Sequence, residues 1–206
     1  MRGQALYVLG LDLGQARDYT AISIARRTEQ NGKGHYALQH LERCALGTPY
    51  PAIVQRITGL DRKIREGPYW GDCRVVVDAT GVGRPVVDLL EDVRGLDVYP
   101  VTITGGDEVN RDGNWFRVPK RELVSGLQVL LQTERLKIAR ELPYAETFVT
   151  ELRDFRVKIT ESGNDTYGAW RDGSHDDLVL SVAIACFVGE VVSKPEVCCG
   201  TPAWMR

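Results

Sequence analysis

The sequence lacks several patterns that define whole classes of protein. No run of 18 or more apolar residues is present, so no transmembrane helix is expected. No G-x-x-x-x-G-K-[ST] segment is present, so the chain has no P-loop for a nucleotide. The five cysteines form no C-x-x-C pair and their number is odd, which argues against a zinc site or a disulfide framework and favours a reducing compartment.

The chain carries no strong excess of charge, and its first residues are not expected to be a signal peptide. A net charge of −2 neither predicts nor excludes nucleic-acid binding, because an acidic metal site would offset a basic groove. The apolar run near the N-terminus carries Asp12 and is followed by no small-residue cleavage site, so it is typical of a core strand. The 206 residues contain no visible linker, and we expect one domain over 1–192 with a loose tail over 193–206.

The first half of the sequence predicts an α/β fold. Three apolar or alternating segments predict consecutive antiparallel strands, at 5–13, 20–27 and 35–44. Helix-like and strand-like segments then alternate, at 48–65, 73–80, 83–95 and 96–104. Such alternation implies parallel strands joined by helical crossovers. We therefore expect a mixed five-stranded sheet, three antiparallel strands followed by parallel ones, with helices on its faces.

The second half predicts helices and one added β-hairpin. A polar, glycine-rich segment at 105–118 is typical of a loop. Helices are expected at 119–136 and 143–155, and two alternating runs around S-G-N-D predict a hairpin at 156–170. The segment 174–192 is apolar on nearly all sides, which indicates a largely buried helix.

Carboxylates stand at three places where the surrounding sequence is apolar. Asp12 interrupts the first strand, Asp78 ends the strand V-V-V-D, and the pair Asp176 and Asp177 opens the last helix. A buried charge is unfavourable unless a partner neutralises it, and no cationic residue neighbours Asp12 or Asp78 within its strand. Magnesium binds carboxylate oxygens. If the strands are neighbours, the carboxylates converge at one end of the sheet, where two ions about 4 Å apart could clamp the attacking and leaving oxygens of a phosphodiester.

A purely structural role is the alternative at each of these positions. Asp12 and Asp78 could begin turns by bonding their own backbone. Asp177 stands three residues after Ser174 and could complete a capping box. Each residue by itself is open to both interpretations. Their joint occurrence, in this order and on these elements, favours the metal site.

The motifs together resemble those of a known family. L-D-L-G before an antiparallel hairpin, V-V-V-D-A-T-G-V-G, V-P-K-R-E-L-V before a leucine-rich helix, and a hairpin followed by H-D-D-L are similar to the nuclease domain of the large terminase subunit of tailed bacteriophages. The resemblance runs from about residue 6 to about residue 190. It implies an RNase H-like fold.

The resemblance also implies an activity and the residues that carry it. The implied enzyme is an endonuclease that uses two Mg²⁺ or Mn²⁺ ions to cut concatemeric viral double-stranded DNA during packaging, in the cytoplasm of the bacterial host. By matching motifs, Asp12 and Asp78 are the catalytic metal ligands on the two strands. Asp177, with or without Asp176, is the ligand on the late helix. The spacing does not choose between these two, and Asp177 is preferred.

Members of this family work in a larger assembly. An ATPase motor precedes the nuclease domain, and the small terminase subunit and the portal are its further implied partners. Because this chain has no P-loop, we expect an isolated domain or a relative without the motor, unable to translocate DNA by itself.

Four other residues are weaker candidates for contacts to nucleic acid. Arg17 lies in the loop beyond Asp12, Lys120 and Arg121 open a helix, and His175 precedes the acidic pair, where it could also assist proton transfer. Each could equally be a solvated residue at a loop or helix start. For His175 the solvated interpretation is favoured.

Other functions stay open on the sequence alone. A Holliday-junction resolvase or an RNA:DNA-hybrid nuclease would share the fold and the metal chemistry. The D-L-G and D-A-T-G-V-G segments are also similar to the phosphate loops of actin-like ATPases and sugar kinases, but those proteins need two lobes and 206 residues hold one. A non-catalytic DNA-binding or capsid-assembly module is disfavoured because all three acidic sites are present.

Overall fold

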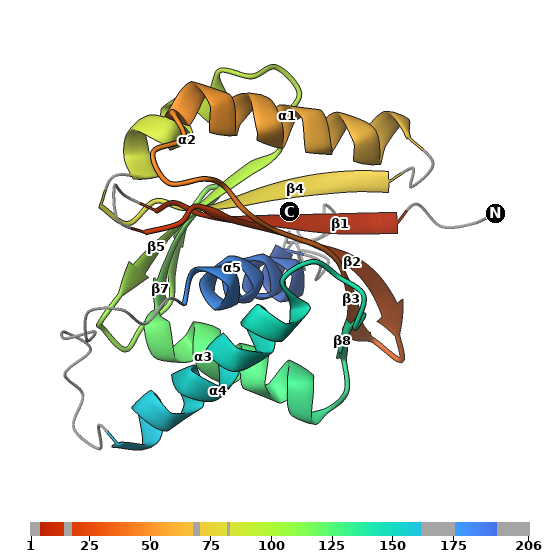
Figure 1. Ribbon diagram of the computed structural model, residues 1–206, viewed down its shortest axis with the longest axis vertical. Coiled ribbons are helices and arrows are strands. Elements are labelled where there is room, and N and C mark those ends of the chain that lie inside the picture. The colour runs from red at the N-terminus through yellow and green to blue at the C-terminus, as the bar shows by residue number, and fades with distance from the viewer. Residues whose placement is uncertain (1–4, 15–17, 68–70, 82, 162–175, 193–206) are drawn as a thin grey trace, which may run out of the picture.

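The computed structural model describes residues 5–14, 18–67, 71–81, 83–161 and 176–192 (Figure 1). The expectations for Arg17, His175, the second arm of the hairpin and the tail over 193–206 lie outside these ranges. No helix in the described part of the chain has the length and apolar character needed to span a bilayer.

A single mixed sheet forms the centre of the molecule. Its strands are β1 (Ala5–Asp12), β2 (Ala21–Gln30), β3 (Lys33–Arg43), β4 (Gly71–Asp78), β5 (Val98–Thr104), β6 (Asn110–Asp112), β7 (Trp115–Pro119) and β8 (Leu136–Ile138). They lie in the order β6-β7-β5-β4-β1-β2-β3-β8. The strands β1, β2 and β3 pair antiparallel, and β1, β4 and β5 pair parallel. The five predicted strands and their directions are therefore confirmed, and three short strands extend the sheet at its edges.

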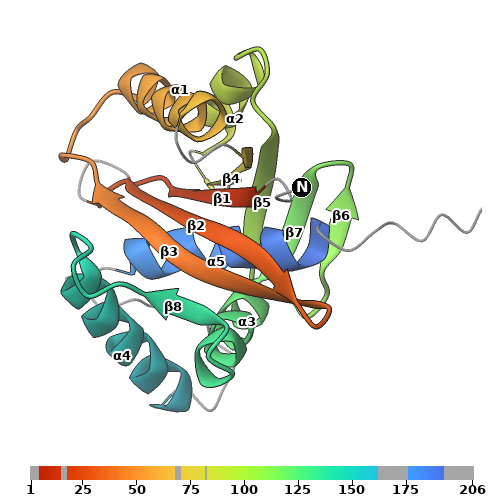
Figure 2. The same ribbon diagram turned by 90° about the vertical axis from the view of Figure 1, so that its right-hand side faces the viewer.

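Helices cover both faces of the sheet (Figure 1). The helices α1 (Tyr50–Glu66) and α2 (Gly83–Glu91) lie on one face, and α3 (Lys120–Gln132), α4 (Ala145–Glu161) and α5 (Asp177–Val192) lie on the other. The apolar helix α5 contacts β1, β2, β3 and β4, and α3 and α4 pack against its outer side (Figure 2). Because α5 lies between the sheet and two helices, it needs apolar side chains around most of its circumference.

Three sequence predictions in the second half need correction. The segment 105–118 is not only a loop, since it contains β6 and most of β7, in which Phe116 and Val118 are buried. The predicted helix over 119–136 ends earlier, at Gln132, and Glu134 then takes a left-handed conformation (φ 55°). No glycine or proline in this segment indicates the end of the helix from the sequence. The first arm of the predicted hairpin is helical, because no glycine or proline interrupts α4 before Glu161.

The alternation of β1 decides where its carboxylate points. Tyr7, Leu9 and Leu11 belong to the core under α1 and α2, whereas Val8 belongs to the core under α5. Gly10 shares the α5 face: a Cβ there would lie 1.8 Å from the carbonyl oxygen of Ser181, so glycine lets the helix backbone approach the strand. With a period of two, the next residue on this face is Asp12.

Candidate metal centre

Two carboxylates meet at the carboxyl ends of β1 and β4. The parallel register pairs Leu11 with Val77, so Asp12 and Asp78 occupy the next matching positions. Their carboxyl groups share a hydrogen bond, and burial raises the pKa of Asp12 well above its ordinary value. The charges of Asp78, Asp176 and Asp177 raise it further. The structure therefore brings the first two predicted ligands together in a place where negative charge accumulates.

Asp78 has a turn function as well. Its Oδ1 accepts the backbone N–H of Thr80 at 2.8 Å, which is the local bond expected of an aspartate that begins a turn. Burial raises the pKa of Asp78, and the bonds to Thr80 oppose that shift. The structural and the metal-binding interpretation are thus compatible at this position, because Asp78 holds the turn and also bonds to Asp12.

The start of α5 brings a third carboxylate and a cation. Asp176, directly before α5, accepts a hydrogen bond from Lys120 Nζ at 3.2 Å. Lys120 opens α3, and its side chain is 13% exposed. Burial lowers the pKa of Lys120, and the charges of Asp176, Asp12 and Asp78 oppose that shift. Of the two basic residues predicted at this helix start, only Lys120 lies at the cluster. Arg121 is 39% exposed and pairs with Asp107 at 2.7 Å.

Asp177 is engaged by an arginine that the sequence did not single out. Arg43, the last residue of β3, donates from Nε to Asp177 Oδ2 at 2.7 Å and from Nη2 to Asp177 Oδ1 at 2.9 Å. The same Nη2 donates to Glu151 of α4. Burial, followed by the charge of Asp177, raises the pKa of Glu151 to about 8, against the opposing effect of Arg43. Asp177 is therefore buried and held in a bidentate ion pair.

Carboxylate oxygens are the donors that hard divalent cations prefer, so the chemistry of the cluster fits Mg²⁺ or Mn²⁺. Within the described ranges, no three acidic, histidine or cysteine side chains are already arranged as a ligand cage. Asp12 and Asp78 share a hydrogen bond, and Asp176 accepts one from Lys120. A bound cation would offset the burial of these carboxylates and the repulsion that adds to the raised pKa of Asp12. The residues fit a divalent ion, with Asp176 turning from Lys120.

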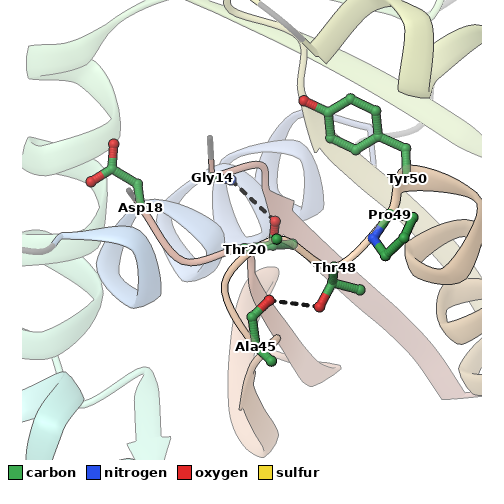
Figure 3. A pocket seen from close by; sticks show the side chains of 8 residues that line it. Gly14, Asp18, Thr20, Ala45, Thr48, Pro49 and Tyr50 are labelled. Atoms are coloured by element: carbon green, nitrogen blue, oxygen red, sulfur yellow. Dashed lines mark hydrogen bonds between the residues drawn. The ribbon is translucent and has the colours of Figure 1, made fainter. Parts of the chain in front are cut away.

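A cavity of about 200 Å³ opens beyond the end of β1 (Figure 3). Small and polar residues line it: Gly14, Asp18, Thr20, Ala45, Gly47, Thr48, Pro49 and Tyr50. Its wall is braced internally, because the N–H of Gly14 donates to Thr20 Oγ1 at 3.2 Å and Thr48 Oγ1 donates to the carbonyl of Ala45 at 2.6 Å. The lining includes none of the clustered carboxylates and no basic side chain. The cavity is therefore separate from the acidic cluster, which is the candidate metal centre.

Comparison with known proteins was made for sequence and for structure. No protein-family model matches the chain. The large terminase subunit of Thermus phage G20c is 28% identical over 184 residues, which are 89% of this chain and 32% of that protein. The chain thus spans about a third of the length of that relative.

Solved structures share the fold at low sequence identity. The large terminase of a thermophilic bacteriophage has a TM-score of 0.56 at 11% identity, over 92% of this chain and 40% of that chain. The human cytomegalovirus terminase nuclease domain, manganese-soaked and inhibitor-bound, has a TM-score of 0.52 at 14% identity, over 89% of this chain and 83% of that chain. The predicted RNase H-like fold and the resemblance drawn from the motifs are confirmed: the chain is similar in sequence to a large terminase subunit and shares the fold of terminase nuclease domains.

Proposed function

We propose that the chain is a metal-dependent endonuclease that cuts concatemeric viral double-stranded DNA during genome packaging. The observation that carries the proposal is the convergence of Asp12, Asp78 and Asp176 at one edge of the sheet, with Lys120 beside them. The fold shared with a manganese-soaked terminase nuclease domain supports a divalent cofactor. The sequence similarity to a large terminase subunit supports the packaging context.

Asp12, Asp78 and Asp176 would hold the ions in this proposal. Asp176 replaces Asp177, the ligand preferred on the sequence, because both oxygens of Asp177 accept hydrogen bonds from Arg43. The carboxylate of Asp176 is 22% exposed, and it is held by the flexible side chain of Lys120. Two Mg²⁺ or Mn²⁺ ions, when bound, would lower the pKa of the attacking water and stabilise the leaving 3′ oxygen.

The chain's own residues would bind and orient the DNA phosphate. Lys120 lies within the cluster and can turn its ammonium from Asp176 to a phosphate oxygen. Arg121, one residue on, is exposed and could contact a phosphate further along the backbone. Binding of this kind is nearly blind to sequence and weakens as salt rises.

The packaging partners are part of the same proposal. The relative from phage G20c is about three times as long as the matched region. We propose that this domain acts with an ATPase motor, a small terminase subunit and a portal, in the cytoplasm of a bacterial host.

A plasmid assay tests the activity directly. Supercoiled DNA is incubated with the protein and Mg²⁺, Mn²⁺ or EDTA, beside Asp78→Ala and the surface control Asp92→Asn at the exposed end of α2. The proposal expects metal-dependent nicking or linearisation that Asp78→Ala loses and Asp92→Asn retains. Branched DNA and an RNA:DNA hybrid, offered in the same assay, separate the related nuclease classes. Absence of cutting with either ion by the folded protein, or full cutting by Asp78→Ala, would refute it.

A further inference from the structure

At the start of α5, the side chain of the residue in the cap position does not cap the helix. Asp176 is the cap residue of this helix, since its carbonyl accepts the N–H of Leu180 at 2.9 Å and the helix begins at Asp177. An aspartate in this position ordinarily turns its carboxylate back onto the amide of the third helical residue, here Val179. In this structure that amide donates to Glu151 Oε2 at 3.2 Å. The carboxylate of Asp176 instead accepts from Lys120.

Glu151 is itself held firmly in place. Its other carboxylate oxygen accepts from Arg43, which also holds both oxygens of Asp177. The side chains of Arg43, Glu151 and Asp177 are 12%, 5% and 7% exposed. The ring of Tyr19 lies 5.0 Å from the guanidinium carbon. One buried unit therefore joins the end of β3, the middle of α4 and the first turn of α5.

From this geometry we propose that Glu151 is a positioning residue of the metal centre: it caps α5 from the neighbouring helix, so that Asp176 can direct its carboxylate to Asp12 and Asp78. The inference rests on the proposed function, because it assigns Asp176 to the metal. Without Glu151, the amide of Val179 would need another acceptor, and the nearest by covalent connection is the carboxylate of Asp176. The helix would then be capped by the residue that the metal needs.

The test measures Mn²⁺ binding by calorimetry, without DNA, on the full chain. We expect Glu151→Ala to weaken Mn²⁺ binding roughly 10- to 100-fold, the usual effect of removing a group that orients a ligand. With DNA, kcat falls while KM for DNA stays unchanged. The matched control is Glu190→Ala, at the opposite end of α5, where Glu190 accepts from Arg135 and Tyr36 at 2.9 Å each. This control should lower thermal stability and leave Mn²⁺ affinity as in wild type.

Glu151→Gln keeps the test decisive if the alanine variant fails to fold. The amide oxygen of glutamine can still accept from Val179, but its NH₂ group then faces Arg43, so we expect a smaller, few-fold loss of Mn²⁺ affinity. Wild-type Mn²⁺ affinity in a folded Glu151→Gln or Glu151→Ala variant would overturn the inference, as would an equal loss in Glu190→Ala. If wild type binds no Mn²⁺ and cuts no DNA, the proposed function falls as well. If wild type does both, only the role of Glu151 is at stake.

Discussion

Polar and charged side chains connect both ends of α5 to neighbouring elements, yet the charges at the two ends differ. At the C-terminal end, Glu190 is balanced by Arg135 and bonded by Tyr36. At the N-terminal end two cations, Lys120 and Arg43, face five carboxyl groups, those of Asp12, Asp78, Glu151, Asp176 and Asp177. A balanced pair holds the helix in place. An excess of carboxylates in a largely enclosed place is unfavourable by itself, and it is the feature that the proposed cation would balance.

We call the N-terminal end of α5, with its five carboxyl groups, the acidic end, and the C-terminal end, with Glu190 and Arg135, the balanced end. The largest effect should come from removing a strand carboxylate at the acidic end. We expect Asp12→Asn to slow DNA cutting about 1000-fold or more, because a lost metal contact removes several kcal/mol of transition-state stabilisation. Glu190→Gln, at the balanced end, should cut at the wild-type rate. Plasmid nicking in Mg²⁺, with circular dichroism to verify folding, measures both. Comparable losses in the two variants would mean that the ends of α5 do not differ in function.

The two neighbouring aspartates at the acidic end should separate stability from metal binding. Asp177→Asn leaves the buried Arg43 without its bidentate partner, and we expect unfolding in urea to become easier by about 3 kcal/mol. Asp176→Asn should leave stability nearly unchanged and abolish measurable Mn²⁺ binding. The reverse pattern, with Asp177→Asn losing metal and Asp176→Asn losing stability, would restore Asp177 as the ligand.

The sequence predicted four of the five carboxylates of this end and also Lys120, but it did not predict Arg43 and Glu151. Asp12 and Asp78 are visible because each stands in an apolar strand, where a charge requires an explanation. Arg43 and Glu151 are separated from their partners by 134 and 108 residues, and each lies in a segment where a charged residue is ordinary. Their importance depends on which elements the fold brings together, and composition and spacing do not contain that information.

Some elements of the fold were likewise predictable from the sequence, and others were not. The five central strands and the buried helix have long apolar signals, and the sequence predicted all of them. The strands β6 and β8 have three residues each, too few for alternation to be distinguished from a loop. They exist because neighbouring strands offer them hydrogen bonds, which is a tertiary effect.

In the metal-free protein, the excess of carboxyl groups at the acidic end should make the free energy of unfolding depend on pH. The pKa values of Asp12, Asp78 and Glu151 are raised in the folded state, so their stabilising contribution is complete below about pH 4 and is lost as pH rises through the folded values, about 8 for Glu151. We therefore expect the free energy of unfolding, measured in EDTA, to decrease as the pH rises from about 4 to about 8. Mg²⁺ should flatten the profile, since it binds the ionised carboxylates of the folded state.

Variants at the two ends provide the control for this profile. Asp12→Asn removes one raised pKa and should make the slope in EDTA shallower. Glu190→Gln should keep the wild-type slope at a lower overall stability. A wild-type profile that is flat in EDTA would show that the acidic end carries no charge penalty, and the comparison between the ends would lose its basis.

The smallest expected effect concerns the cation inside the cluster. Lys120 donates to Asp176, so a metal ion must compete with its ammonium for that carboxylate. We expect Lys120→Met to bind Mn²⁺ a few-fold more tightly without DNA, while its affinity for DNA falls because a phosphate contact is lost. Arg121→Met, the adjacent exposed residue, should leave Mn²⁺ affinity unchanged. Weaker Mn²⁺ binding in Lys120→Met would mean that the ammonium organises the carboxylates rather than competing for them, and the cluster would then depend on its own cation much as Glu190 depends on Arg135.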